Sequence, residues 1–463
     1  MTGQRALYPM LVTLGVCFVI ALIWKFVPHP AVAVVLCLLP LGVLFVLNQT
    51  FWLVSLFVLF SFFRIHEAIP ALYSLKIPLL LSLGALSALV WHSLISKQLK
   101  TFWHPSFTWL SIFWFLVFIG ILFSSNPGLA IKYFKAIYWK IIIMTFAIAW
   151  LVNSALNVQR ISILIVLAGG LIACVALSNS INGIGLVEGT RVTIGRNLGS
   201  VLGDPNDLSL VLMFPLAFAI SLMTTKNLGG VRILGLIGTI LSLSAVIATQ
   251  SRGGLLGSVA VFGIFGLRII KSKVLLAVIG TLALLVLAAA AGISDRKSGG
   301  AAEEGIDASA MGRLYAWEAA FGMAVDNPVT GVGLNNFYSN YFFYSPHWDG
   351  LNHAVHSTWF GVLAETGFVG LFVFVGCIYS LVKTSQQTLG LLDSDPSNYS
   401  PYLHGTATAV YAGIIGTIVS GTFLTQGFTW PIYILAALCI ALNRIVQNSS
   451  QNEKISETSL NKT

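Results

Sequence analysis

Long uninterrupted apolar runs are the feature of this 463-residue sequence that most limits its possible folds. Most of the runs are about 17–20 residues long, which is the length that a helix needs to cross the hydrocarbon core of a bilayer. They do not alternate polar and apolar residues, as the strands of a membrane β-barrel would. Because backbone groups in lipid must hydrogen-bond to one another, these runs predict an all-α polytopic membrane protein.

The runs divide the whole chain, residues 1–463, into one predicted membrane domain. Two of them are short, so we expect about 12–14 transmembrane helices. A large loop at 294–356 should contain short helices, and a polar, disordered cytoplasmic tail should follow at 447–463. The runs lie at 7–24, 31–47, 50–66, 77–95, 105–123, 137–152, 161–178, 207–223, 231–249, 253–269, 274–293, 357–382, 404–425 and 429–446.

Composition excludes the other broad classes of protein. Apolar residues make up 57% of the chain and charged residues only 9%, whereas a soluble domain carries about 25% charged residues. A net charge of +9 would suggest nucleic acid in a soluble protein. Here the basic residues are scattered between apolar runs, so we expect the bilayer and anionic lipids or substrates as partners, and no nucleic acid. The five cysteines lie inside apolar runs without metal or redox spacing.

Basic residues in short loops predict which side of the membrane each loop faces. Lys97 and Lys100 lie in one short loop, and Arg268, Lys271 and Lys273 lie in another. The positive-inside rule places both loops, and with them both termini, in the cytoplasm. Basic residues are nearly as frequent on the opposite side, so an inverted topology is the alternative. Their presence there, among Gly, Asp, Asn and His, favours an anionic substrate on that side.

The segment at 179–206 is a second long loop, and it carries two arginines. Arg191 and Arg196 stand in a glycine-rich stretch, and Asp207 is the expected N-cap of the apolar helix that follows. Two guanidinium groups on irregular backbone can bind one phosphate. The alternative is an ordinary loop whose arginines lie at the membrane interface.

Arg252 stands at the start of another apolar run, in the sequence Ser-Arg-Gly-Gly at 251–254. The two glycines would let a ligand approach the backbone and the free amides of a helix start. We expect phosphate binding here, and the alternative is an arginine that merely extends to the membrane surface. Lys132 and Lys135 could add positive charge to the same site.

The loop at 294–356 contains one predicted helix and one glycine turn. Arg313 and Trp317 lie one turn apart on that helix, where they can stack. The Gly-Val-Gly turn at 331–333 is only a weak signal for nucleotide binding. The apolar stripe of the helix, typical of a helix at the membrane interface, consists of Leu314, Trp317, Phe321 and Ala324.

His353 and His356 stand just before the long run that begins at Ser357. With Asp349 they could bind a metal, although no third firm ligand follows at helical spacing. A structural histidine at a helix start is a second alternative. We favour a general base, or a hydrogen-bonding group, in a solvated cavity above the membrane. The preceding aromatic residues, an interface belt or a sugar-stacking platform, are Tyr338, Tyr341, Tyr344 and Trp348.

These residues resemble the signature of a known family. The sequence resembles the H-[NSQ]-x9-G-x2-G and R-x3-L patterns of bacterial O-antigen ligases. The stretch from Arg313 to Gly333 looks like the large periplasmic loop of the wider superfamily of ligases, O-antigen polymerases and bacterial O-oligosaccharyltransferases. The matching residues are His356, Ser357, Gly367 and Gly370 for the first pattern and Arg252 with Leu256 for the second.

The resemblance implies a metal-independent inverting glycosyltransferase of the GT-C type in the bacterial inner membrane, with no cofactor. The donor would be a glycan on undecaprenyl diphosphate. The acceptor would be a hydroxyl of a lipid A-core sugar, another glycan or a protein, at the periplasmic face. A polymerase of the same superfamily is the alternative. A flippase for lipid-linked glycans is an alternative of another class, although neither the paired repeats nor the broken helices of many transporters are evident.

Two chemical needs of such a reaction select residues in this sequence. The leaving diphosphate needs positive charge, and the acceptor hydroxyl needs a neutral imidazole as its base. We therefore expect His356 and Arg252 to be catalytic. The expected substrate-binding residues are Arg191, Arg196, Arg313, Lys132, Lys135 and Trp317, and no metal ligands are expected.

The predicted topology can be tested by cysteine accessibility. Ser298 lies in the loop expected in the periplasm, while both termini and the turn at Lys271–Lys273 should be cytoplasmic. In a cysteine-free background, Ser298→Cys should react with a membrane-impermeant maleimide applied from the periplasmic side. Labelling only from the cytoplasmic side would contradict both the topology and the position of the site.

Overall fold

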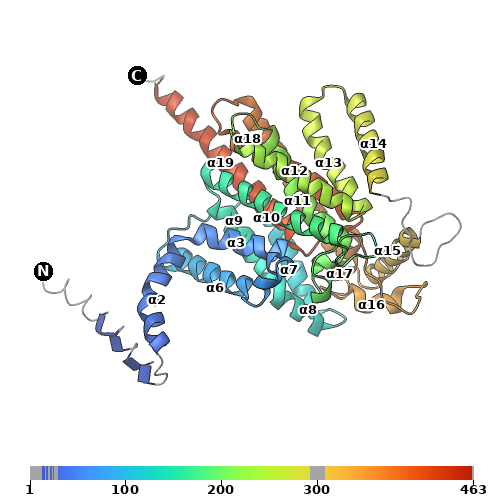
Figure 1. Cartoon of the computed structure of the whole chain (residues 1–463), viewed down its shortest axis with the longest axis horizontal. Coiled ribbons are helices and arrows are strands. Elements are labelled where there is room, and N and C mark those ends of the chain that lie inside the picture. The colour runs from blue at the N-terminus through green and yellow to red at the C-terminus, as the bar shows by residue number, and fades with distance from the viewer. Residues whose placement is uncertain are drawn as a thin grey trace.

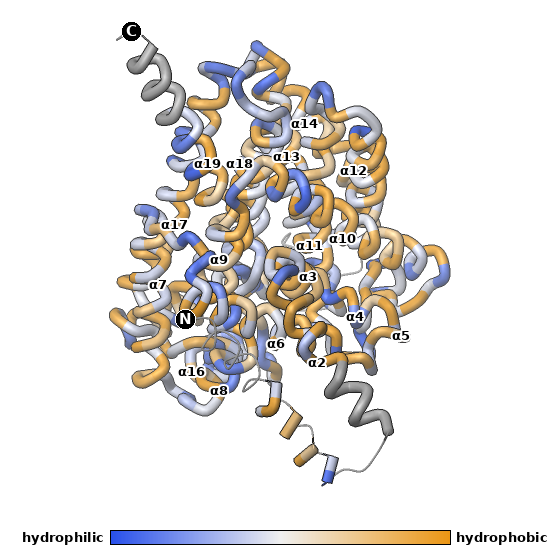
Figure 2. Tube along the Cα trace, turned by 90° about the vertical axis from the view of Figure 1, so that its left-hand side faces the viewer, coloured by the Kyte–Doolittle hydropathy of each residue, from blue (hydrophilic) through white to orange (hydrophobic). Residues whose placement is uncertain are grey.

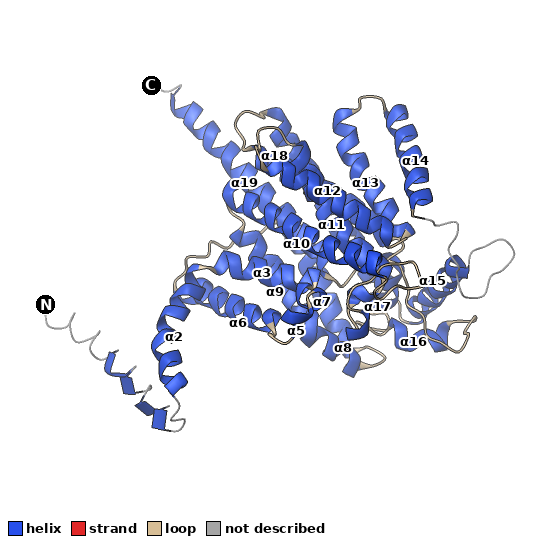
Figure 3. Cartoon of the chain, viewed as in Figure 1, coloured by secondary structure: helices blue, strands red, loops and turns tan. Residues whose placement is uncertain are grey.

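Apolar helices make up nearly all of the chain that the structure describes. The computed structural model describes residues 13–15, 17, 18, 21, 22, 24 and 25, then 30–291 and 308–460. Within these residues, every regular element is a helix, apart from an isolated backbone bridge between Val187 and Arg191 (Figure 3). The all-α prediction is therefore confirmed. Most of the predicted run at 7–24, and Arg296, Lys297 and Ser298 of the long loop, lie outside the described residues.

Eleven helical units among the described residues are long and apolar enough to cross a membrane. A bent pair, α2 (Pro30–Asn48) and α3 (Thr50–Phe63), adds a twelfth, and its two helices meet at 79°. The two short predicted runs thus form one bent pair, which counts as one span at most. The eleven units are α6 with η1 (Ile77–Ile95), α7 (Pro105–Leu122), α8 with η2 and α9 (Pro127–Leu151), α10 (Ala155–Asn182), α11 (Pro205–Thr224), α12 (Val231–Ala248), α13 (Arg252–Ile269), α14 (Lys273–Ala290), α17 (Thr358–Ser394), α18 (Pro401–Gly421) and α19 (Trp430–Leu460).

The remaining elements are short or lie outside the spans. α19 continues to Leu460, so the polar tail at 447–463, expected to be disordered, is helical over most of its length. Two longer helices, α15 and α16, lie together beside α17 at one end of the bundle (Figure 1). The other elements are α4 (Ile65–Ala68), α5 (Pro70–Tyr73), η3 (Arg196–Leu198), η4 (Val201–Gly203), α15 (Ala308–Asp326) and α16 (Phe337–Tyr344).

α11 is the central helix of the bundle, and α14 is a peripheral one. α11 packs against α10, α12, α13 and α18 and is buried along nearly its whole length. α14 packs mainly on α13 and has no buried residue. Apolar residues cover the outer helices in Figure 2, and polar residues concentrate toward the helix ends and the loops. This distribution is that of a bundle whose sides face lipid.

α17 is interrupted at Gly367, and the interruption anchors the long loop. Gly367 has φ 68° and ψ −172° inside the helix, a left-handed backbone that favours glycine. The break frees the amide of Phe368 to donate to the carbonyl of Pro328 at 2.8 Å, and Val332 donates to the carbonyl of Ala364 at 2.8 Å. A Cβ at Gly367 would stand 2.5 Å from the oxygen of Pro328. This glycine of the signature therefore has an architectural role.

A small second core holds α15 and α16 against the first turns of α17. α15 buries its small-residue face and leaves Leu314 and Phe321 about half exposed. Only these two residues of the predicted stripe are available to the membrane interface, because Trp317 packs against this core and Ala324 is fully buried. The Gly-Val-Gly turn at 331–333 packs against α17 and α7 and not around a ligand. The buried residues of this core are Ala316, Ala319, Ala320, Met323, Val332, Phe337, Tyr341, Val355 and Ala364.

The sequence predicted Asp207 as the N-cap of α11, but the N-cap is Asp204. Pro205 occupies the first turn, where its fixed φ and missing N–H cost nothing. The Asp204 carboxylate accepts from the amides of Asn206 at 2.7 Å and Asp207 at 3.3 Å. Proline moves the helix start three residues toward the N-terminus, and the Asp207 side chain is left for another role.

The glycines after Arg252 serve helix packing. Ser251 caps α13 by accepting from the amide of Gly254 at 3.3 Å. A Cβ at Gly254 would lie 1.8 Å from the Oγ of Ser209 on α11, and one at Gly253 would lie 3.3 Å from Phe423. Both glycines are buried. The expected approach of a ligand to this backbone is therefore wrong, because α11 and the end of α18 already occupy the space.

Gly254→Ala should destabilise the bundle, since the added methyl group overlaps Ser209 and overpacking costs about 1–3 kcal/mol. Gly263→Ala on the same helix is the control, because its Cβ would meet nothing within 4 Å. Thermal unfolding of the purified proteins in detergent measures the difference. The double variant with Ser209→Gly should recover most of the loss. Equal unfolding temperatures for the two single variants would contradict the packing argument.

Candidate functional site

The side-chain oxygen of Asn206 joins the two arginine segments that the sequence singled out. Asn206 Oδ1 accepts from the guanidinium Nη2 of Arg191 at 3.1 Å and from the hydroxyl of Ser251 at 3.0 Å. All three residues are buried. Ser251 directly precedes Arg252, so one acceptor in the first turn of α11 brings the loop 179–206 to the start of α13. Asn206 had no predicted role, although a polar side chain just inside an apolar run is the signal for one.

Arg191 is held by the protein on several sides. Its Nε donates to the carbonyl of Thr249 at 3.1 Å, and Nη1 lies 3.7 Å from the carboxylate of Glu188. Only 3% of the residue is exposed. These contacts fix the loop against the end of α12, so Arg191 positions the site. Direct contact between Arg191 and a diphosphate remains a prediction.

Arg252 and Arg196 lie close to the hydrogen-bonded group of Arg191, Asn206 and Ser251, but at the surface of the protein. Arg252 begins α13 and is partly exposed, so its guanidinium group extends from a fixed helix start. Arg196 is exposed on η3 and donates to the carbonyl of Gly203 at 3.3 Å, one residue before the Asp204 cap. Two cations therefore flank the N-terminus of α11.

His356 occupies a constrained backbone position at the start of α17. Its φ is +44°, in the left-handed region that few residues other than glycine adopt. Ser357 follows as the N-cap and accepts from the amide of Phe360 at 3.4 Å. The hydroxyl of Thr358 donates to the carbonyl of Leu424 at 2.6 Å and accepts from the amide of Gln426 at 3.0 Å. The surrounding contacts maintain the strained residue, which is the usual situation at functional sites.

Charged groups from three parts of the chain surround the His356 ring. Burial lowers the pKa of His356 below 6.5; Arg313, His353 and Arg191 lower it further, and Asp204 raises it. The imidazole is therefore neutral at pH 7 and can accept a proton. Arg191, Arg313 and Asp204 are therefore close enough to His356 to act on its charge.

Trp317 holds the segment that carries His356. Its indole Nε1 donates to the carbonyl of Val355 at 3.1 Å, and its ring stacks on Phe360 with centroids 5.0 Å apart. Trp317 thus contacts the chain on both sides of His356. These contacts give it a positioning role, and its predicted contact with substrate remains untested.

His353 contacts Asp349 and not the groups that surround His356. Its Nε2 lies 3.0 Å from both carboxylate oxygens of Asp349, and its ring meets the edge of Tyr341. The pKa of Asp349 is lowered, chiefly by its hydrogen bond to His353. No group of three metal-ligating side chains occurs among the described residues. The contact between His353 and Asp349 links two positions of the loop that precedes α17.

Glu365 is a site-forming residue for which no role was predicted. Its carboxylate accepts from the backbone amides of Asn335 at 2.8 Å and Phe337 at 3.3 Å, at the start of α16. A carboxylate at a helix N-terminus is favoured by the free amides and the helix dipole. Glu365 thereby ties α16 to α17. An acidic residue inside an apolar run was the available signal.

Lys132 and Lys135 lie on exposed faces of α8 and η2. None of the contacts among the described residues joins either lysine to His356. Their predicted part in diphosphate binding therefore depends on a substrate long enough to reach them, and it stays a prediction.

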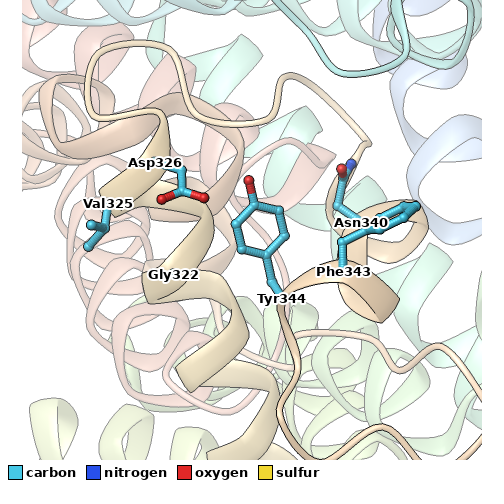
Figure 4. A pocket seen from close by; sticks show the side chains of 6 residues that line it. All are labelled: Gly322, Val325, Asp326, Asn340, Phe343 and Tyr344. Carbon is cyan, nitrogen blue, oxygen red and sulfur yellow. The ribbon is translucent and has the colours of Figure 1, made fainter.

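An open hollow of about 660 Å³ lies between α15 and α16 (Figure 4). Figure 4 shows the hydroxyl of Tyr344 and the carboxylate of Asp326 facing the same space, with Asn340 and Phe343 across from them. Aromatic rings beside polar groups suit a sugar, which has apolar faces and hydroxyl edges. Tyr344 fits the predicted platform, whereas Tyr341 does not, because it is buried in the second core.

A comparison of the sequence with models of known families matches a segment that contains part of this site. Residues 237–375 match the family model described as O-antigen ligase. The match runs from α12 into α17 and includes Arg252 and His356, while Arg191 and Arg196 precede it. No individual curated protein matches the chain. The match supports a multi-pass membrane enzyme of the ligase or polymerase type. It confirms, over this segment, the resemblance of the sequence motifs to the O-antigen ligase superfamily.

Proposed function

We propose that this protein transfers a glycan from undecaprenyl diphosphate to an acceptor hydroxyl, with inversion and without a metal, at the periplasmic face of the inner membrane. The observation that carries the proposal is the neutral His356 ring at the start of α17, with Arg191, Arg313 and Asp204 around it. Lipid A-core, another glycan chain and a protein are the candidate acceptors. The family match supports the reaction class, and the motifs support the residues.

The residues suit the two halves of such a transfer. The acceptor oxygen attacks the anomeric carbon while its proton passes to the neutral imidazole of His356. The bond from that carbon to the diphosphate oxygen breaks, and the electron pair leaves with the diphosphate. Arg252 and Arg313 would stabilise the charge that develops there. The charges are balanced within the site, so the step needs no other reactant.

His356→Ala should lower turnover about 10²–10⁴-fold while donor affinity stays near the wild-type value, because a general base acts in the chemical step. His353→Ala is the matched control and should matter less, since His353 is paired with Asp349. Turnover at saturating donor and acceptor, with donor binding measured separately, gives the answer. Wild-type turnover would make His356 a structural residue, and weakened donor binding alone would make it a diphosphate ligand.

The activity of the wild-type enzyme should also depend on pH with a defined sign. Protonation removes the lone pair of the imidazole, so activity should fall as pH decreases through the pKa of His356. That pKa is lowered by burial, so the fall should come below pH 6.5 and activity should be full at neutral pH. Chelators should have no effect. A loss of activity centred above pH 6.5 would contradict the assignment.

Arg252→Ala should weaken use of the diphosphate donor roughly tenfold to over a hundredfold, since a hydrogen bond to a charged group contributes about 1.5–3 kcal/mol. Arg252→Lys should restore only part, because it keeps the charge and loses the guanidinium fork. Arg232→Ala, on the partly exposed first turn of α12, is the control. The measurement is the donor dependence of initial rates, and an unimpaired Arg252→Ala enzyme would refute the role.

The identity of the acceptor decides between ligase and polymerase. Purified protein in detergent, supplied with a lipid-linked donor and candidate acceptors, should form a glycosylated product that mass analysis identifies. An acceptor on lipid A-core indicates a ligase, and a lengthened glycan indicates a polymerase. A flippase would form no product under these conditions, because transport needs a sealed bilayer.

A further inference from the structure

Two adjacent hollows lie at the end of the bundle that is remote from His356. The larger, of about 500 Å³, lies between the start of α7, the second half of α17 and α19. The smaller, of about 440 Å³, lies between the segment before α7, the end of α9 (Trp139–Leu151) and α19. Phe102 and Arg444 line both hollows. The two hollows therefore adjoin one another across these two residues.

The course of α7 shows how far these hollows are from the reaction site. The C-terminal end of α7 is at the loop helices, because the amide of Ser125 donates to the carbonyl of Val332 at 3.0 Å. Its N-terminal end carries His104 and Pro105, which line the larger hollow. α7 has 18 residues, so it is about 27 Å long, close to the hydrocarbon thickness of a bilayer, about 30 Å. The hollows therefore lie at headgroup depth in the other leaflet, on the side predicted to be cytoplasmic.

A buried chain of hydrogen bonds forms the floor of the larger hollow. His104 Nδ1 accepts from the amide of Ser106 at 3.1 Å, so Nε2 carries the proton and donates it to Oδ1 of Asn443 at 3.2 Å. Asn443 donates in turn to the hydroxyl of Thr388 at 3.0 Å. Burial lowers the pKa of His104, which keeps its ring neutral at pH 7. The floor is therefore fixed in place and adds no charge to the hollow.

Three basic residues line the hollows, and no acidic residue lines either of them. Lys383 lines the larger hollow, Lys100 lines the smaller, and Arg444 lines both. Within the part of the chain that the structure describes, none of the three forms an ion pair. The Arg444 guanidinium lies over the ring of Phe102, 5.5 Å from its centroid, which holds this cation between the two hollows. The surface is therefore complementary to an anion with a negative group on each side of Arg444.

Aromatic rings around the larger hollow indicate that the anion belongs to a lipid. Trp103 is 62% exposed and Tyr379 is 67% exposed, and both rings line the hollow. The indole of Trp103 is oriented by its hydrogen bond to the hydroxyl of Thr108 at 2.9 Å. Exposed Trp and Tyr rings concentrate at the level of lipid headgroups. A soluble anion would contact only the cations, whereas a phospholipid contacts both the cations and the rings.

We propose that the two hollows bind one molecule of a phospholipid with two phosphates joined through glycerol, which is the chemistry of cardiolipin. One phosphate lies between Lys383 and Arg444, and the other lies between Arg444 and Lys100. The acyl chains pass Trp109 and Tyr379, which line the larger hollow one turn nearer the bilayer centre. Basic pockets between membrane helices on the cytoplasmic side are typical sites for this lipid. A phospholipid with one phosphate would leave one of the lysines without an anion.

The proposal is independent of the transfer reaction, because none of these residues belongs to the His356 cluster. Native mass spectrometry of the purified full-length protein, titrated with lipid, tests it. Wild-type protein should bind cardiolipin about fivefold or more tightly than phosphatidylglycerol at equal phosphate concentration, since each additional cation near a phosphate contributes about that factor. Equal binding of the two lipids at equal phosphate would overturn the proposal. His356→Ala should bind cardiolipin normally, so failure of the transfer proposal is distinguishable.

Arg444→Gln should weaken cardiolipin binding about fivefold or more and abolish the preference over phosphatidylglycerol, because Arg444 serves both phosphates. Lys226→Gln is the matched control: Lys226 is exposed just after α11, at the same end of the bundle, and lines neither hollow. Size-exclusion chromatography shows that each variant folds. Unchanged cardiolipin binding by folded Arg444→Gln, or an equal loss in Lys226→Gln, would contradict the assignment.

A second pair of variants adds a negative charge without removing a cation. Gln387→Glu places a carboxylate in the wall of the larger hollow and should weaken cardiolipin binding by repulsion. Gln386→Glu adds the same charge one residue away, where the side chain contacts the hydroxyl of Tyr411 instead, and it should bind normally. The same titration measures both variants. Equal affinities for the two would show that the lipid does not occupy this hollow.

Discussion

The break in α17 at Gly367 is the constraint on which the functional end of this molecule depends. A continuous helix would satisfy its own amides and carbonyls and would offer nothing to a neighbouring loop. The break releases the amide of Phe368 to Pro328 and the carbonyl of Ala364 to Val332. These bonds, with the carboxylate of Glu365 on α16, hold the loop helices over the first turns of α17. His356 lies between those helices and the membrane-spanning bundle because of this anchoring.

Hydrogen bonds between side chains stabilise the interior of the bundle, as they do in any protein surrounded by lipid. A polar atom without a protein partner in this environment has no water with which to form a hydrogen bond. Asn206 therefore accepts from Arg191 and Ser251 at once, and Arg191 also reaches the end of α12. The result is a rigid joint at the N-terminus of α11. Preorganised groups of this kind suit a reaction in which charge develops on a leaving group, since they need no rearrangement.

Two of the cavities in this molecule differ in a way that follows from their surroundings. The hollow between α15 and α16 is open, and Asp326, Asn340 and Tyr344 give it a polar and aromatic lining. A second cavity, between α3 and α11, lies among membrane spans and is mostly apolar, with the polar side chains of Lys140 and Asp207 in its wall. A lipid-linked glycan has one part that fits each environment. The His356 cluster lies at the junction of the loop helices and the spans, where the two parts of the proposed donor would meet.

The sequence was enough to predict the helical spans, because a run of sufficient length and hydropathy can satisfy its backbone hydrogen bonds in lipid only as a helix. It also selected Arg252 and His356, whose motifs depend on residue type and spacing. It did not determine which helices are buried: α14 is more apolar than α11, yet α14 has no buried residue and α11 is central. Lipid is as apolar as a protein core, so hydropathy does not distinguish the two. Tertiary packing alone decided that Gly254 makes room for Ser209, that Arg191 is enclosed by Asn206 and Thr249, and that Asp207 faces a cavity. Each of these outcomes depends on a contact between segments that the sequence does not place side by side.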